Sequence, residues 1–274
     1  MGFSQSQTKA HGTNSVPWLL LTKCESNLSP FLLPYPLPPG ESENRLLRAI
    51  IFDFDGVIVD SEPLIMDLTR RMAALEGWNV TAEEYYRDYL ALDDRGIVER
   101  LYHAHGRPLD VRRRDELVRW KEEVYLEAIR EGLPAVPGAR EFVRRCAARY
   151  PLAIASGSLR REVEYLLSKL GLEREFSALS TAEECERSKP DPCAYLTALT
   201  KLQALESFRD RRLQAAECLA VEDAPAGIDA AHAAGMKCMA LAYSRPAGEL
   251  RHAEWAYSTF AEACLSRVED GFRS

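Results

Sequence analysis

Residues 47–57 read LRAIIFDFDGV, an apolar run that ends in two acidic residues and a glycine. A short, continuously apolar run is typical of a buried strand in a parallel sheet. Because side chains alternate along a strand, Asp53 and Asp55 would point the same way at its carboxyl end. Gly56 lets the chain turn sharply away. Two carboxylates this close repel unless a cation lies between them, which favours a functional site over the alternative, an ordinary Asp-Gly turn with solvated acids.

Strand and helix patterns alternate through the rest of the chain. Further apolar runs predict strands at 151–156, 176–179, 218–222, 237–243 and, weakly, 256–258. Helical patterns lie between them, near 138–149, 160–170, 191–203 and 224–235. Alternating strands and helices predict an α/β fold, a doubly wound parallel sheet with helices on both faces.

One section interrupts this alternation. Between the first two predicted strands we find four helical patterns, near 62–76, 81–90, 94–105 and 110–131. We therefore expect a helical subdomain over 64–133, inserted into a catalytic core of residues 46–63 and 134–274. Ligands bind at the carboxyl edge of a parallel sheet, so an insertion that leaves from that edge would cover the site as a lid.

Polar residues follow two further predicted strands. Ser156 ends the strand at 151–156 and Gly157 follows it. A hydroxyl and free backbone N–H groups at this place can hold a phosphate oxygen. An ordinary Ser-Gly loop is the alternative. Glu222 and Asp223 end the strand at 218–222, and hard oxygen ligands at this edge suit Mg²⁺. Helix capping by Asp223 is the alternative interpretation there.

A lysine completes the charged set. Lys189 lies in the run SKPDP, whose prolines fix the backbone and begin a helix. A rigidly placed ammonium can balance clustered carboxylates and a phosphate, although a surface lysine in a turn explains the run equally well.

Composition excludes several classes of protein. The 274 residues include 35 Lys and Arg against 42 Asp and Glu, a net charge of −7, which argues against a nucleic-acid binder. No apolar run is long enough for a membrane span. The seven cysteines are scattered and include no C-x-x-C pair, so we expect neither a zinc site nor a disulfide framework, and a cytoplasmic location. We expect a monomer whose partner is a small molecule.

The first 45 residues differ from the rest. They hold six of the fifteen prolines and show no lasting period, which predicts a disordered or extended tail over residues 1–45. Their low acidity and several serines leave an organellar transit peptide as an alternative.

The four strand-end motifs together resemble the haloacid dehalogenase superfamily, in its phosphatase and phosphomutase branch. Residues 53–62, DFDGVIVDSE, match the first motif of that family, and Ser156, Lys189 and the pair Glu222-Asp223 match the other three. The match covers roughly residues 47–260, and the inserted helices resemble the C1-type cap. The resemblance is closest to β-phosphoglucomutase-like proteins and sugar-phosphate phosphatases.

The resemblance implies roles for the acidic residues. Asp53 would be the nucleophile that becomes an aspartyl phosphate. Asp55 would protonate the leaving oxygen and then activate water. A Mg²⁺ ion would be held by Asp53, the backbone carbonyl of Asp55 and Asp223, with Glu222 adjacent.

The resemblance also implies phosphate-binding groups. Ser156 and Lys189 would hold the phosphoryl oxygens, helped by backbone N–H groups at Gly56 and Gly157. The whole pattern predicts a Mg²⁺-dependent phosphatase that acts on a small phosphorylated metabolite, a sugar phosphate.

The predicted cap leaves alternatives open. Arg95 and Lys121 lie at spacings like those of the basic residues that bind sugar phosphate in the mutase cap, although a solvated helix face would explain them equally. Mutase-like members commonly carry a histidine where Ile65 stands, so hydrolysis is favoured and a phosphomutase is the alternative. A non-catalytic phospho-accepting switch is disfavoured by Asp55 and by the helical lid.

Overall fold

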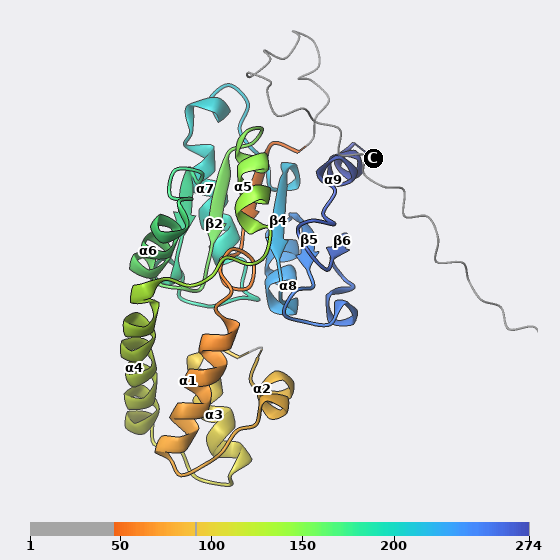
Figure 1. The fold of residues 1–274 in the computed structure, drawn as a ribbon. Helices are drawn as coiled ribbons and strands as arrows, with labels where there is room; N and C mark the ends of the chain where they lie inside the picture. Colours follow the sequence, from red (N-terminus) through yellow and green to blue (C-terminus); the bar gives the residue numbers. More distant parts are fainter. Residues whose placement is uncertain (1–46, 91, 274) are drawn as a thin grey trace, which may run out of the picture. The chain divides into compact units, whose positions relative to one another are not determined.

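Within residues 47–90 and 92–273, which the computed structural model describes, six parallel strands form one sheet in the order β3-β2-β1-β4-β5-β6 (Figure 1). The strands are β1 (Ala49–Phe52), β2 (Leu152–Ala155), β3 (Ala178–Ser180), β4 (Cys218–Glu222), β5 (Lys237–Leu241) and β6 (Trp255–Tyr257). At the centre, Ile51 of β1 is in register with Ala153 of β2 and Ala220 of β4. All six predicted strands are present.

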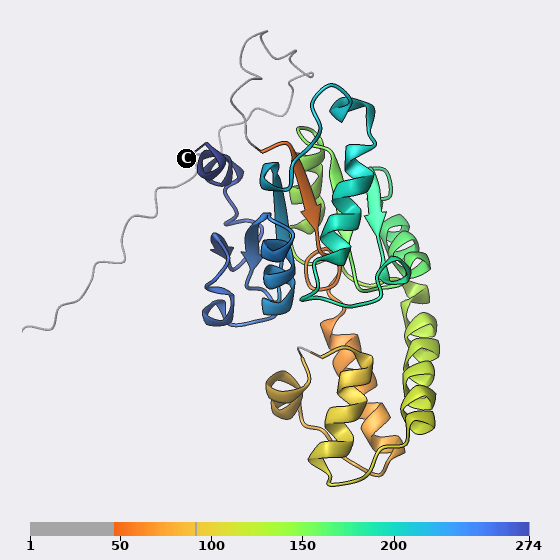
Figure 2. The same ribbon diagram turned by 180° about the vertical axis from the view of Figure 1, so that it is seen from behind.

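Helices cover both faces of the sheet, as Figures 1 and 2 show from opposite sides. They are α5 (Ala139–Ala147), α6 (Arg160–Leu170), α7 (Cys193–Gln203), α8 (Pro225–Ala233) and α9 (Leu265–Phe272). Alternate residues of β1 divide between the faces: Ile50 and Phe52 pack with α5, α6 and α9, and Ile51 packs with α7 and α8. The predicted doubly wound α/β fold is confirmed, and α9 is an addition to it.

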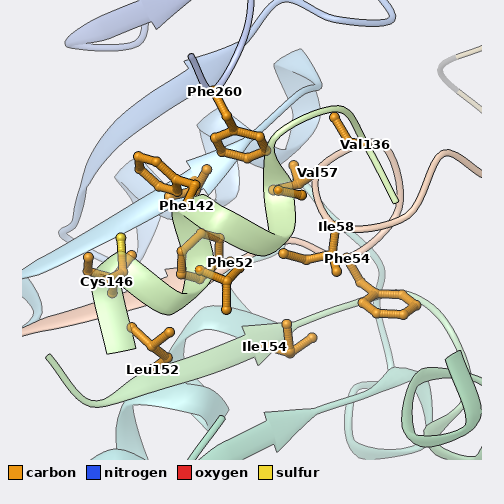
Figure 3. Close-up of a cluster of buried hydrophobic side chains, with 14 of the residues drawn as sticks. Phe52, Phe54, Val57, Ile58, Val136, Phe142, Cys146, Leu152, Ile154 and Phe260 are labelled. Carbon is orange, nitrogen blue, oxygen red and sulfur yellow. The ribbon is translucent and has the colours of Figure 1, made fainter. Parts of the chain in front are cut away.

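Aromatic side chains pack against the end of β1 on the face of the sheet that α5 covers. The ring of Phe52 meets that of Phe142 on α5 edge-on, with centroids 6.2 Å apart, and Phe142 stacks on Phe260 (Figure 3). Phe54 lies between the two acidic residues of the first motif and is fully buried in the same cluster. Packing on this face therefore holds the chain that carries Asp53 and Asp55.

Four helices lie between β1 and β2: α1 (Glu62–Leu75), α2 (Ala82–Asp88), α3 (Asp94–Ala104) and α4 (Val111–Ala128). Each of the last three begins at a capping side chain, namely Thr81, Asp93 or Asp110. The helices bury an apolar cluster of their own, which includes Met72, Tyr85, Ile97, Leu101 and Leu117. We call residues 62–128 the helical insert.

Short 3₁₀ helices complete the described chain, at Ile129–Glu131, Ala182–Glu184, Glu206–Phe208, Ala215–Glu217 and Ala247–Leu250. No helix in the described ranges has both the length and the apolar character needed to cross a bilayer. The tail predicted for residues 1–45 lies outside the described residues.

One cysteine pair corrects an expectation from the sequence. Cys185 and Cys193 form a disulfide, whereas the scattered spacing had argued against disulfides. The two residues flank the loop that carries Lys189, and the turn of that loop brings their Cα atoms to 5.8 Å. Spatial proximity across a proline-rich turn is not visible in a cysteine count.

Candidate active site

The motif residues converge at the carboxyl edge of the central strands. Asp53 follows β1, Ser156 follows β2, and Glu222 is the last residue of β4, so neighbouring strands present them side by side. Lys189 arrives from the loop before α7: its Nζ donates to Asp53 Oδ1 at 2.7 Å and to Glu222 Oε1 at 2.6 Å. The ammonium therefore joins a carboxylate of β1 to one of β4.

Three carboxylates form a cluster that could hold a divalent cation. Asp53, Glu222 and Asp223 each offer an oxygen, and these oxygens all lie within 4.8 Å of one another. Burial raises the pKa of Glu222 and of Asp223, and the negative charge of Asp53 raises both further. Burial alone would lower the pKa of Lys189, but Asp53 and Glu222 outweigh it and raise that pKa. The available metal ligands are carboxylate oxygens, and the positive charge around them is too small to balance their negative charge. Both features fit Mg²⁺.

Two glycines leave room for these carboxylates. Gly56 has φ +75°, and a Cβ atom there would overlap the carboxylate of Asp223. A Cβ atom on Gly227, in the first turn of α8, would overlap the carboxylate of Glu222. Glycine at both positions therefore allows the backbone to approach the acidic cluster closely.

Asp55 has surroundings of its own. Ser158 Oγ donates to Asp55 Oδ2 at 2.5 Å, and the Ser158 N–H donates to Ser156 Oγ at 2.9 Å. Burial raises the pKa of Asp55, and the negative charge of Asp53 adds to this, while the Ser158 bond opposes it. The two aspartates at the end of β1 thus differ: Asp53 faces an ammonium, and Asp55 faces a hydroxyl.

Gly157 lies in the same loop, between Ser156 and Ser158, and is exposed.

The two residues chosen from the sequence for the predicted cap differ from each other in their surroundings. Lys121 is buried on α4 and ion-paired with Asp94 of α3, so it is not part of a solvated face. Arg95 is an exposed side chain on α3.

Sequence reasoning missed three hydroxyl groups that support the site. Ser158 lies only two residues beyond Ser156, within a motif already singled out. Tyr195 Oη donates to Glu222 Oε1 at 2.6 Å, but it sits inside α7 with the spacing of a core residue. Ser244 Oγ donates to Asp223 Oδ2 at 2.8 Å from the loop after β5, where no motif marks it.

Comparisons with known proteins show which family the chain is similar to. The family model of haloacid dehalogenase-like hydrolases matches residues 47–235. A phosphorylated carbohydrates phosphatase of Thermotoga maritima is 32% identical over 197 residues, which are 70% of this chain and 83% of that protein. Hexitol phosphatase B of Escherichia coli K12 is also 32% identical over 197 residues, covering 72% of this chain and 84% of its own length.

Solved structures show the same fold. A β-phosphoglucomutase from Clostridium difficile superimposes with a TM-score of 0.69 at 20% identity and covers 82% of this chain and 97% of its own. The resemblance predicted from the four motifs is confirmed, as is the predicted class of enzyme, a hydrolase of this superfamily. With a family model that spans all four motifs and two relatives at 32% identity, the chain belongs to the haloacid dehalogenase-like hydrolase family.

Proposed function

We propose that this hydrolase is a Mg²⁺-dependent phosphatase that cleaves a small phosphorylated carbohydrate through an aspartyl phosphate on Asp53. The main support is that two carboxylates at the end of one strand have different partners. Asp53 contacts the Lys189 ammonium, and Asp55 contacts the Ser158 hydroxyl. Carboxylates in different environments can take different roles, one as nucleophile and the other as acid and base.

The residues present suggest two steps. Asp53 attacks phosphorus while Asp55, whose raised pKa favours its protonated form, gives a proton to the leaving oxygen. The Asp55 carboxylate then takes a proton from the water that hydrolyses the acyl phosphate. Ser156, Lys189 and backbone N–H groups at Gly56 and Gly157 would hold the phosphoryl oxygens.

Asp53, Glu222 and Asp223 are the side chains that would hold Mg²⁺, together with the backbone carbonyl of Asp55. When bound there, the ion supplies positive charge between the carboxylates and the phosphate, which otherwise repel.

We propose that residues 64–133 act as a cap over a core of residues 46–63 and 134–274, and that Arg95 and Lys121 belong to the substrate-facing set of that cap. Burial raises the pKa of Glu62 at the start of α1, and the charge of Lys121 is among the smaller effects that oppose this shift, which supports a place for Lys121 near that carboxylate. Hydrolysis is favoured over phosphomutase chemistry because Ile65, which stands where mutase-like members commonly carry a histidine, packs against the apolar cluster of the insert.

The test is phosphate release from a panel of phosphorylated metabolites, with Mg²⁺ and with EDTA. We expect Mg²⁺-dependent release that is abolished in Asp53→Asn. Asp55→Asn should lose turnover but still bind Mg²⁺, because its side chain lies outside the acidic cluster. Near-normal turnover in Asp55→Asn would reject its acid–base role. Isomerisation of a hexose phosphate that requires a sugar bisphosphate activator and releases little phosphate would instead identify a mutase.

A further inference from the structure

The loop after β5 connects the acidic cluster to the helical insert. Ser244 bonds the carboxylate of Asp223, as described above. The next side chain, Arg245, reaches in the other direction, and its Nη2 donates to the backbone carbonyl of Leu90 at 2.8 Å. Two successive residues of one loop therefore contact a metal-site carboxylate and the insert.

Arg245 is an unusual arginine because its charge is buried but not paired. The residue is only 9% exposed, and its Nε–H is buried without a hydrogen-bond partner. Among the described residues, no carboxylate lies within 4.0 Å of its guanidinium nitrogens. Buried guanidinium groups ordinarily have their donors satisfied, so a donor left over beside an active site indicates a group that a ligand completes.

An acidic group of the insert faces the same region. Glu62 begins α1, and Tyr85 Oη donates to its Oε1 at 2.5 Å, which fixes the orientation of the carboxylate. Tyr243 Oη, two residues before Arg245, donates to Asp60 Oδ2 at 3.0 Å, two residues before Glu62, so the loop after β5 is bonded to the chain that leads into α1. Burial raises the pKa of Glu62, and the charge of Arg245 opposes that shift, although the two groups form no ion pair. Arg245 has the same opposing effect on Asp223. The bonds of Ser244 to Asp223 and of Arg245 to Leu90 place this loop between the acidic cluster and the insert.

We propose that Arg245 and Glu62 bind the organic part of the substrate and select phosphate esters that carry hydroxyl groups. The inference rests on the proposed phosphatase function. With the phosphoryl group of the intact ester beside Asp53, its organic part extends toward the insert. There the guanidinium donates to a hydroxyl or carbonyl oxygen, and the Glu62 carboxylate accepts from a hydroxyl. An ester without hydroxyls would satisfy neither group.

The test compares hexose and hexitol phosphates with 4-nitrophenyl phosphate, which has no hydroxyl on its organic part. In Arg245→Gln, we expect the ratio of kcat/KM for the best sugar phosphate to kcat/KM for 4-nitrophenyl phosphate to fall tenfold or more, mainly through KM. Arg245→Lys should restore part of the ratio. The matched control is Arg251→Gln, an exposed arginine six residues further along, which should leave the ratio unchanged.

Each outcome decides between roles. An equal loss on both substrates would show that Arg245 only supports the structure and would overturn the proposal, as would an unchanged ratio. Should Arg245→Gln fail to fold, Glu62→Gln keeps the Tyr85 bond and gives the same readout. Wild-type protein that hydrolyses none of these esters overturns the proposed function, and this inference with it. Activity in the wild type with an unchanged ratio in the variants overturns this inference alone.

Discussion

Replacing Lys189 by methionine removes the positive charge that joins Asp53 to Glu222. The ammonium is 2.7 Å and 2.6 Å from their carboxylates, its side chain is 16% exposed, and that of Glu222 is fully buried. Removing one partner of a buried ion pair costs about 3–5 kcal/mol, because the remaining charge is left uncompensated. We expect a loss of that size in the free energy of unfolding, measured by urea denaturation in EDTA at pH 7.

Mg²⁺ should reverse part of this loss, since a bound cation supplies the missing charge. The stabilisation on going from EDTA to saturating Mg²⁺ should therefore be larger in Lys189→Met than in the wild type. The control is Lys201→Met, which removes a half-buried lysine paired with Glu184 and should cost only about 1 kcal/mol. Equal stabilisation of wild type and Lys189→Met by Mg²⁺, or a loss no larger than that of the control, would refute this account of the charge balance.

Three further substitutions probe the supports of the site. Tyr195→Phe removes a buried hydrogen bond to a charged acceptor and should lower the free energy of unfolding by about 1.5–3 kcal/mol, measured by denaturant titration. Gly227→Ala adds a methyl group against the Glu222 carboxylate, so calorimetric Mg²⁺ titration should show weaker binding, and stability should fall by about 1–3 kcal/mol although alanine is the better helix former. Burial raises the pKa of the Glu162 carboxyl to about 7, so folding favours its protonated form. The stability that this carboxyl contributes is therefore full below pH 4.5 and is lost as pH rises through 7. Glu162→Gln should therefore gain about 1 kcal/mol relative to the wild type between pH 5 and pH 8, after allowance for solvent screening, and a constant difference in thermal unfolding across that range would contradict this.

Local patterns were enough to predict the sheet and the main acidic residues. Each predicted strand lies within two residues of the observed one, because buried parallel strands are continuously apolar and end in abrupt polar runs. Asp53, Lys189 and Glu222 were all found from such strand ends and prolines, and the structure brings them into direct contact.

Contacts that depend on tertiary placement could not be predicted. Tyr195 has the spacing of an ordinary core residue, and only the folded structure, in which α7 packs against β2 and β3, reveals its bond to Glu222. Lys121 lies on a helix rich in charges, so the sequence could not show that it is buried against Asp94. The Cys185–Cys193 bond likewise depends on the path of the loop between them.

The order of the strands governs when the site can exist during synthesis. β1 and β4 are neighbours at the centre of the sheet, yet the whole helical insert, β2 and β3 are translated between them. Such non-local pairing forms late in folding, since the intervening chain must be made and its loop closed first. A ribosome-bound chain that has emerged only as far as β3 carries Asp53 but lacks Glu222 and Asp223, so the cluster of three carboxylates forms only after β4 has paired with β1.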